Sequence, residues 1–277
     1  MTVYTLSEAE LRQVQLIQLE MLDEVDRICK KCNIKYNIIA GTLLGAVRNG
    51  GYIPWDDDAD VALLRPEYEK FRKACKTELD KDRFYFQDNR NTEGYRWGYG
   101  KLRRKGTVFM RQNQEHMPYA QGVFIDIFPL DNVPAAYPIR VLHNLQCFCI
   151  RKILWAEVGK KAETNMGMRA LYKLLSKIPL TVVYRYYYHM VHYWGQKETK
   201  WVRILTFPTP NKAYGYKREW YEKSTNYTFE NKVFRGIKDY DAYLNFKFGM
   251  YMELPPVEKR KTHPVSSLKL VTPKIDR

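Results

Sequence analysis

The pattern of apolar residues predicts a long helix at the start of the chain. Ser7 and Glu10 have the spacing of a capping box, in which each side chain satisfies a backbone N–H group at a helix start. Apolar residues then recur at every third or fourth position as far as about Lys31, the spacing of one helix face. These residues are Leu11, Val14, Ile17, Met21, Leu22, Val25 and Ile28. Pro66 begins a second amphipathic pattern, with Tyr68, Phe71, Cys75 and Leu79 on its apolar face.

Short apolar segments between and after these helices predict strands. The run at 38–39 leads into a glycine-rich stretch that we expect to be a turn, and 61–64 predicts a buried strand. Further strands are expected at 84–86, 98–102 and 107–110. The strongest strand pattern covers 123–128, and Pro129 is expected to end it.

The second half of the chain changes character. From Ala135 the pattern becomes helical, over about 137–158 and 167–195, and the stretch after Pro255 and Pro256 is expected to be irregular. We therefore predict an α/β (α+β) fold in three parts. They are a catalytic core at 1–134, a basic aromatic helical region at 135–200, and a C-terminal segment at 201–277 that packs back on the core.

Charge is distributed unevenly between the two halves. The chain has 46 Lys and Arg against 31 Asp and Glu, and the first 138 residues hold 20 of each kind. The whole net charge of +15 therefore belongs to the second half. A basic surface rich in Trp, Tyr and Lys suits an anionic lipid surface or polymer. A simple helical cap on the core remains the alternative, and no nucleic-acid-binding module is recognisable.

Composition limits the class of protein further. With 45% apolar and 28% charged residues, the chain is globular rather than disordered. Its cysteines show no metal-binding spacing, and we expect reduced thiols in a cytoplasmic protein. The N-terminal pattern is not that of a signal peptide, and no apolar stretch is long enough to span a bilayer. We expect a peripheral protein on the inner face of the cell membrane.

An acidic run carries the clearest chemistry. Asp56, Asp57, Asp58 and Asp60 lie between the glycine-rich stretch and the strand at 61–64. So much negative charge in a folded protein needs compensating cations. If the segment is extended, Asp58 and Asp60 share one face and can bind Mg²⁺ or Mn²⁺. Asp56 would be a further metal ligand or would orient the other two, and the side chain of Asp57 would point away from the metal.

Neither a calcium loop nor a solvated turn fits the acidic run as well as a metal site does. An EF-hand-like calcium loop would require glycine where Val61 stands, and the following residues are too apolar for an exposed loop. A solvated acidic turn fits poorly beside Trp55 and the apolar flanks. A site for Mg²⁺ or Mn²⁺ is therefore the favoured hypothesis.

Three motifs resemble one known family. Gly41-Thr42-Leu43-Leu44-Gly45-Ala46-Val47-Arg48, followed by Ile53-Pro54-Trp55-Asp56-Asp57-Asp58-Ala59-Asp60-Val61, resembles the signature of the LicD family. Ile125-Asp126-Ile127-Phe128-Pro129-Leu130-Asp131 is similar to its later acidic strand. Tyr240-Asp241-Ala242-Tyr243-Leu244 and Phe248-Gly249-Met250-Tyr251-Met252-Glu253-Leu254-Pro255-Pro256 are similar to its closing motif. Arg104 and Met250 stand where family members often have acidic residues.

The resemblance implies a nucleotidyltransferase-like mixed sheet and a set of site residues. Asp126 matches the third carboxylate, either as a metal ligand or as the base that takes a proton from the attacking hydroxyl. Metal ligands are then expected among Asp56, Asp58, Asp60 and Asp126. Substrate phosphates are expected to contact Gly41 and Thr42 by close approach, and Arg48, Lys101 and Arg103 by their charge.

The same resemblance implies a reaction. Members of the family are phosphorylcholine transferases of bacterial cell-surface polymers, and fukutin-related protein is a relative. We expect transfer from a CDP-linked donor, CDP-choline first, to a sugar hydroxyl of a glycan or lipid-linked polymer precursor, with release of CMP. Tyr95, Trp97, Tyr99 and Trp220 are candidates for a choline cage. The alternatives are a nucleotidyltransferase that releases pyrophosphate and a non-catalytic membrane-associated assembly protein.

Overall fold

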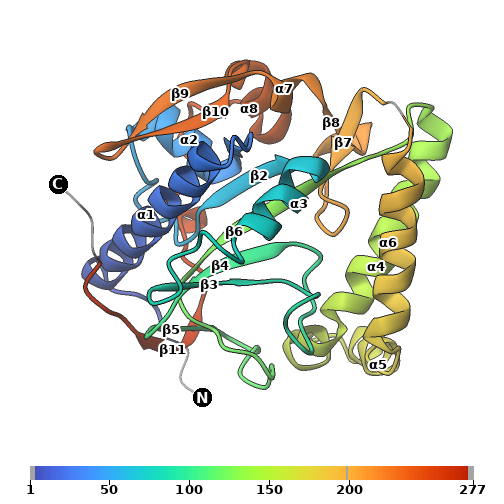
Figure 1. The fold of residues 1–277 in the computed structure, drawn as a ribbon. Coiled ribbons are helices and arrows are strands. Elements are labelled where there is room, and N and C mark those ends of the chain that lie inside the picture. The colour runs from blue at the N-terminus through green and yellow to red at the C-terminus, as the bar shows by residue number, and fades with distance from the viewer. Residues whose placement is uncertain (1–3, 198, 274–277) are drawn as a thin grey trace.

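One large mixed sheet organises the molecule. The structure is a computed structural model that describes residues 4–197 and 199–273. The strands follow the order β3–β4–β6–β2–β1–β10–β9, with β7 paired to β6 and β8 to β7 (Figure 1). Their bounds are β1 Asn37–Ile38, β2 Asp60–Leu64, β3 Phe84–Gln87, β4 Gly100–Arg104, β6 Phe124–Asn132, β7 Trp201–Arg203, β8 Tyr216–Lys217, β9 Ser224–Phe229 and β10 Lys232–Ile237. The predicted α/β fold class is confirmed.

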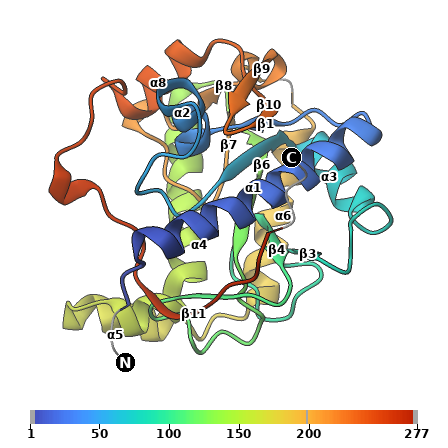
Figure 2. The same ribbon diagram turned by 90° about the vertical axis from the view of Figure 1, so that its left-hand side faces the viewer.

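The first helices form where the apolar patterns predict them. Helix α1, Glu8–Lys31, begins with the capping box of Ser7 and Glu10 and buries its apolar stripe, including Val14, Ile17 and Met21. It contacts β4 and β6 and crosses in front of the sheet in Figure 2. Helix α3, Arg65–Ala74, has Pro66 in its first turn, as predicted, and buries Tyr68 and Phe71.

The glycine-rich stretch is a helix, so the predicted turn is wrong. Helix α2 covers Ala40–Asn49, and the chain enters it directly from β1 through Ala40, whose φ is +50°. Glycine is unfavourable inside a helix, so packing against neighbouring segments, rather than helix propensity, stabilises α2. A Cβ atom at Gly45 would lie 2.3 Å from the carbonyl oxygen of Gly51. Glycine at this position thus permits close packing of α2 on the segment that follows it.

Strand β6 continues through Pro129, so the predicted strand end is also wrong. The Asp126 N–H donates to the carbonyl of Ala59 on the β2 side. Backbone N–H groups point alternately to the two sides of a strand, so the backbone nitrogen of Pro129 faces away from β2. On that side β4 pairs with β6 only as far as Ile127, and β7 pairs with β6 only from Asp131 onward. Proline is tolerated because no neighbouring strand needs its missing N–H.

Three helices follow β6 and lie along one edge of the molecule. They are α4 Tyr137–Ala162, α5 Met166–Leu175 and α6 Leu180–Gly195. The second predicted helix is therefore two helices, because Pro179 interrupts it and becomes the N-cap of α6. Helices α4 and α6 pack side by side (Figure 1) around a small cluster that includes Cys147, Ile150 and Tyr187.

The C-terminal part returns to the sheet. It contains α7 Glu219–Glu222, α8 Tyr240–Phe248, β11 Val265–Lys269, and 3₁₀ turns at Asn211–Ala213 and Val257–Lys259. The tail is expected from the sequence to be irregular, but β11 pairs with β5, Val108–Arg111, beside the N-terminal end of α1. The division at residues 134 and 200 stays a prediction. No helix in the described ranges is long and apolar enough to cross a bilayer.

Candidate active site

The sheet brings three charged residues into one row. Lys101 on β4 is the register partner of Asp126 on β6, and Asp126 is the register partner of Asp60 on β2. Register partners point to the same face of a sheet, so all three side chains project from one face. Residues predicted from three separate parts of the sequence therefore meet across neighbouring strands.

Helix α2 supports the start of this row. The Asp60 backbone N–H donates to Thr42 Oγ1 at 2.8 Å, which fixes the first residue of β2 against the first turn of α2. A Cβ atom at Gly41 would lie 2.4 Å from Asp56 Oδ2, so glycine lets that carboxylate keep its position. Gly41 and Thr42 thus contact the acidic segment itself. Their predicted contact with substrate phosphates stays a prediction.

The carboxylates repel one another in a buried setting. Burial raises the pKa of Asp60 well above its usual value, and repulsion from Asp58 and Asp126 raises it further. The pKa of Asp56 is raised in the same way by burial and then by Asp58 and Asp57. The site therefore holds more negative charge than the surrounding protein neutralises.

Lys101 forms an ion pair with Asp126. Its ammonium group bonds Asp126 Oδ1, and both side chains are buried. Burial lowers the pKa of Lys101 to about 8, although the charge of Asp126 acts to raise it. Burial raises the pKa of Asp126. Nζ also lies 3.4 Å from the centroid of the Phe124 ring. Lys101 therefore occupies one side of Asp126.

Asp57 is not the outward-facing bystander that the sequence predicts, because the structure gives it a specific role. It is buried, and its carboxylate accepts a hydrogen bond from the backbone N–H of His263 at 2.9 Å and pairs with His263 Nδ1 at 2.7 Å. Although burial opposes it, the hydrogen bond from His263 and the nearby Arg111 hold the pKa of Asp57 below its usual value. Asp57 anchors the C-terminal segment at the site.

Two further cations lie at the site and are not apparent from the sequence. Arg111, from β5, lies 3.4 Å from Asp58 Oδ2 and 3.6 Å from Asp57 Oδ1. The second cation is Lys247, from α8. Burial lowers the pKa of Lys247, and the charge of Asp60 opposes this lowering. Neither residue belongs to a motif with recognisable spacing, since each reaches the site only through the tertiary fold.

A cavity of about 360 Å³ opens over the carboxylates. Its charged and polar lining consists of Asp58, Asp126, Lys101, Arg103, Arg111, His263 and three glutamines, Gln112, Gln114 and Gln121. Its aromatic lining consists of Trp97, Tyr99, Phe109, Phe124, Trp155 and Phe207. Of the four candidates for a choline cage, Trp97 and Tyr99 line this cavity, whereas Tyr95 and Trp220 are buried elsewhere.

The predicted phosphate-binding cations are placed differently from one another. Arg103 lines the cavity, but its guanidinium is buried and donates to Gln87 Oε1 and the carbonyl of Gly122. Arg48 lies near the end of α2 and donates to the carbonyl of Tyr251 at 2.9 Å, and it is not among the described residues that line the cavity. Lys101 is both in the cavity and beside a carboxylate.

The donor atoms fit a hard divalent cation. Carboxylate oxygens are the ligands that Mg²⁺ and Mn²⁺ prefer, and five aspartates face three cations, Lys101, Arg111 and Lys247. In the part of the chain that the structure describes, the group of at least three side chains whose ligand atoms all lie within 4.8 Å of one another is Asp57, Asp58 and His263. The predicted set of Asp56, Asp58, Asp60 and Asp126 is spread more widely, and Lys101 occupies one oxygen of Asp126.

Comparison with known proteins gives the class of the domain. Residues 33–140 match the family model described as LicD/FKTN/FKRP, nucleotidyltransferase domain. That range contains α2, the acidic run and the Asp126 strand, which together form the site. Residues 33–140 are therefore a nucleotidyltransferase-like domain.

Individual relatives make the assignment more specific. The chain is 26% identical over 263 residues to the lipopolysaccharide cholinephosphotransferase LicD of Haemophilus influenzae, an alignment covering 92% of this chain and 96% of the relative. It is also 35% identical over 75 residues to an uncharacterized protein of Rickettsia typhi, which covers 25% of this chain and 24% of that protein. Residues 33–140 thus form a domain of the LicD/FKTN/FKRP type, and nearly the whole chain is similar to the Haemophilus protein.

Proposed function

We propose that this protein is a metal-dependent phosphotransferase that moves phosphocholine from CDP-choline to a sugar hydroxyl of a cell-surface polymer precursor and releases CMP. The observation that carries the proposal is the row of Asp60 and Asp126 with Asp58 beside a cavity of about 360 Å³. The transferase activity and the choline group follow the function for which the Haemophilus relative is named.

The carboxylates have a defined task in this proposal. Asp58 and Asp60, supported by Asp56, would hold Mg²⁺ or Mn²⁺. When bound, such an ion neutralises the pyrophosphate of the donor and the charge on the departing CMP. Arg111, 3.4 Å from Asp58, would pair with a phosphate oxygen through its guanidinium.

The chemical step itself is a single displacement. The acceptor hydroxyl oxygen forms a bond to the phosphorus that bears choline, and the bond from that phosphorus to the CMP oxygen breaks. The hydroxyl proton leaves to a base. Asp126 is the candidate for either a third ligand or this base, and its ion pair with Lys101 favours the second role, since an ammonium already neutralises one oxygen.

The donor and acceptor identities rest on chemistry that can be assayed. Trp97 and Tyr99 on the cavity wall offer aromatic faces to a quaternary ammonium group. Donors without that group, such as CDP-ethanolamine, CDP-glycerol and CDP-ribitol, should compete poorly with CDP-choline. Lipopolysaccharide is the first acceptor to test, and teichoic acid and capsule precursors are the alternatives.

The test is product analysis with purified protein. CDP-choline and an acceptor glycan should yield CMP with Mg²⁺ or Mn²⁺ and none with EDTA. Asp58→Asn should abolish the release, and Asp82→Asn, which removes an exposed carboxylate outside the site, should not. A nucleotidyltransferase is the second candidate, because the matching family model carries that description. Its signature would be pyrophosphate and a nucleotide adduct in place of CMP.

A further inference from the structure

Helix α4 has apolar residues on two opposite faces. Cys147, Ile150 and Leu154 are buried against α6. On the other side Leu142, Leu145 and Phe148 are 63%, 57% and 42% exposed. A helix on the surface of a globular protein normally turns polar residues outward, so this second stripe has no partner within the described chain.

Helix α5 extends the same surface. It exposes Met166, Leu171 and Leu174, and Tyr172 packs against Gly159 of α4. Lys152 joins the two helices, since its Nζ donates to Tyr172 Oη at 2.8 Å and lies 5.4 Å from the centroid of the Phe148 ring. We call the exposed side chains of α4 and α5 the α4–α5 surface. It holds ten of the 21 exposed large apolar side chains among the described residues.

Cations surround these apolar side chains. Residues 137–175 contain seven Lys and Arg against two Asp and Glu. Lys173, and Lys177 just beyond α5, are exposed and have no carboxylate within ion-pair distance in the described part of the chain. Unpaired cations next to exposed apolar groups are the composition of segments that lie in the interface of an anionic membrane.

We infer that the α4–α5 surface docks on an anionic phospholipid bilayer. The apolar stripe of Leu142, Leu145 and Phe148 would enter the boundary between headgroups and acyl chains, and the cations would meet the lipid phosphates. A second copy of the chain is a poorer occupant, because two like-charged surfaces repel when they are placed face to face. This inference does not depend on the reaction.

The position of the surface has a consequence that rests on the proposed function. A second cavity, of about 340 Å³, lies between the α4–α5 surface and the carboxylate cavity. Arg151, Lys152 and Tyr172 line it on the helical side, and it shares Trp97, Tyr99, Trp155 and Phe207 with the carboxylate cavity. An acceptor anchored in the bilayer would thus reach the carboxylates along the surface of the docked protein.

The experiment is vesicle co-sedimentation with the full chain. Vesicles of phosphatidylcholine alone and of phosphatidylcholine with phosphatidylglycerol are compared at low and high salt. We expect binding only to vesicles with phosphatidylglycerol, and weaker binding at high salt. Asp58→Asn should bind as the unmodified protein does, so a failure of the chemistry and a failure of docking are distinguishable.

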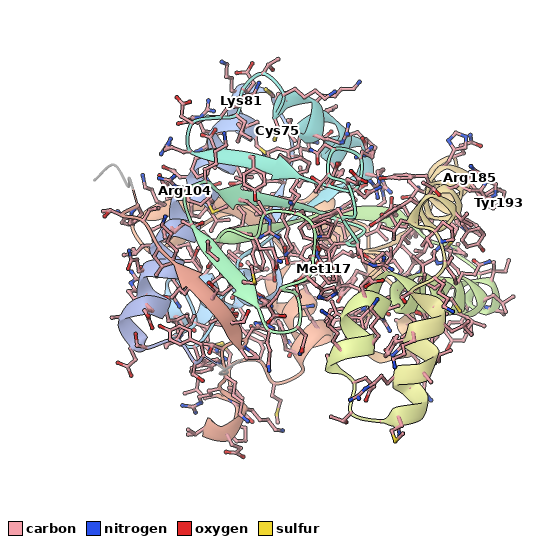
Figure 3. All side chains as sticks on the ribbon, turned by 90° about the horizontal axis from the view of Figure 1, so that it is seen from below. Cys75, Lys81, Arg104, Met117, Arg185 and Tyr193 are labelled. Carbon is pink, nitrogen blue, oxygen red and sulfur yellow. The ribbon has the colours of Figure 1, made fainter. Side chains whose placement is uncertain are left out.

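Matched variants locate the surface. Replacing two cations in Lys173→Glu/Lys177→Glu should weaken vesicle binding by at least about 25-fold, at roughly fivefold for each lost cation. Lys76→Glu/Lys81→Glu removes two exposed cations at the edge opposite α5, where Figure 3 labels Lys81, and should change binding little. Leu145→Ser should also weaken binding, whereas Leu254→Ser, at 55% exposure elsewhere on the surface, should not.

Three results would overturn the inference. One is equal binding to neutral and anionic vesicles, or to neither. Another is an equal loss of binding in the control pair. The third is a dimer in sedimentation velocity that Leu145→Ser converts to a monomer, which would assign the surface to a second copy of the chain.

Discussion

The carboxylate site and the α4–α5 surface differ in where their charged side chains lie. At the site, buried Asp126 and Lys101 and half-buried Asp60 lie in register across three strands. On the surface, Lys173 is exposed and Leu145 is more than half exposed, with no partner in the described chain. Both arrangements are unfavourable for an isolated protein, and each becomes favourable with a particular partner.

The difference indicates what kind of partner would suit each region. Buried repelling carboxylates are stabilised by a small cation that enters the site, since the geometry is rigid and the donors are oxygen atoms. An open surface with apolar and cationic groups is stabilised by a broad, soft, anionic partner. The first region is expected to respond strongly to single substitutions, and the second to respond weakly.

The largest effect is expected from Asp60→Asn. CMP release should fall at least about a thousandfold, because the neutral amide cannot hold a divalent cation against the donor phosphates. The melting temperature should stay the same or rise, since burial and repulsion make the charge on Asp60 costly. Turnover and thermal unfolding measure both, with Asp82→Asn as the control. Turnover within tenfold of the unmodified protein would remove Asp60 from the mechanism.

The next largest effect is expected from Lys101→Met. Removing the ammonium leaves Asp126 buried without its partner, which should cost about 3–5 kcal/mol of unfolding free energy. Denaturant unfolding measures this loss. The double variant Lys101→Met/Asp126→Asn should recover much of it, because no unpaired charge is left. If the two single losses simply add, the pair is not coupled as the structure indicates.

Metal and pH should act on stability together. The pKa values of Asp56 and Asp60 are raised above 3.8, so the folded protein binds more protons than the unfolded chain. Without metal, the free energy of unfolding should fall as the pH rises above about 3.8. Asp57, whose pKa is lowered, contributes stability that is lost only as the pH falls below about 3.8, outside this window.

A divalent ion should reverse that trend. Mn²⁺ at about a hundred times its dissociation constant should add about 2.7 kcal/mol, with the larger gain at the higher pH, where fewer protons compete for the carboxylates. Thermal unfolding at several pH values with Mn²⁺ or EDTA measures the effect. An unfolding free energy that is insensitive to Mn²⁺ at every pH would argue against a site at these residues.

The smallest effect is expected on the α4–α5 surface. Leu145→Ser should change the free energy of unfolding by no more than about 0.5 kcal/mol, since Leu145 is 57% exposed. Leu102→Ala, in the buried core of β4, should cost about 2–5 kcal/mol. Denaturant unfolding of the two variants compares them. A large loss in Leu145→Ser would mean that this side chain is part of the core.

The sequence predicts those parts of the fold that local pattern determines. The capping box and the apolar stripe locate α1 to within a few residues. Apolar residues around Asp60 and Asp126 predict their strands, and the resemblance to the LicD family groups the two carboxylates, which the structure then shows as register partners.

The errors occur where distant contacts decide the structure. Gly41 and Gly45 favour a turn by propensity, yet α2 forms because Thr42 accepts from Asp60 and small residues allow close packing. Pro129 is tolerated by the position of neighbouring strands, which no local pattern reveals. Arg111 and His263 reach the site through the pairing of β5 with β11, which are separated by more than about 150 residues.

The measurement that tests the central claim most directly is CMP release from CDP-choline in the presence of acceptor, with Mn²⁺ or with EDTA, for the unmodified protein and for Asp58→Asn. We predict CMP only from the unmodified protein with Mn²⁺. Equal release in EDTA, or full release by Asp58→Asn, would contradict the claim.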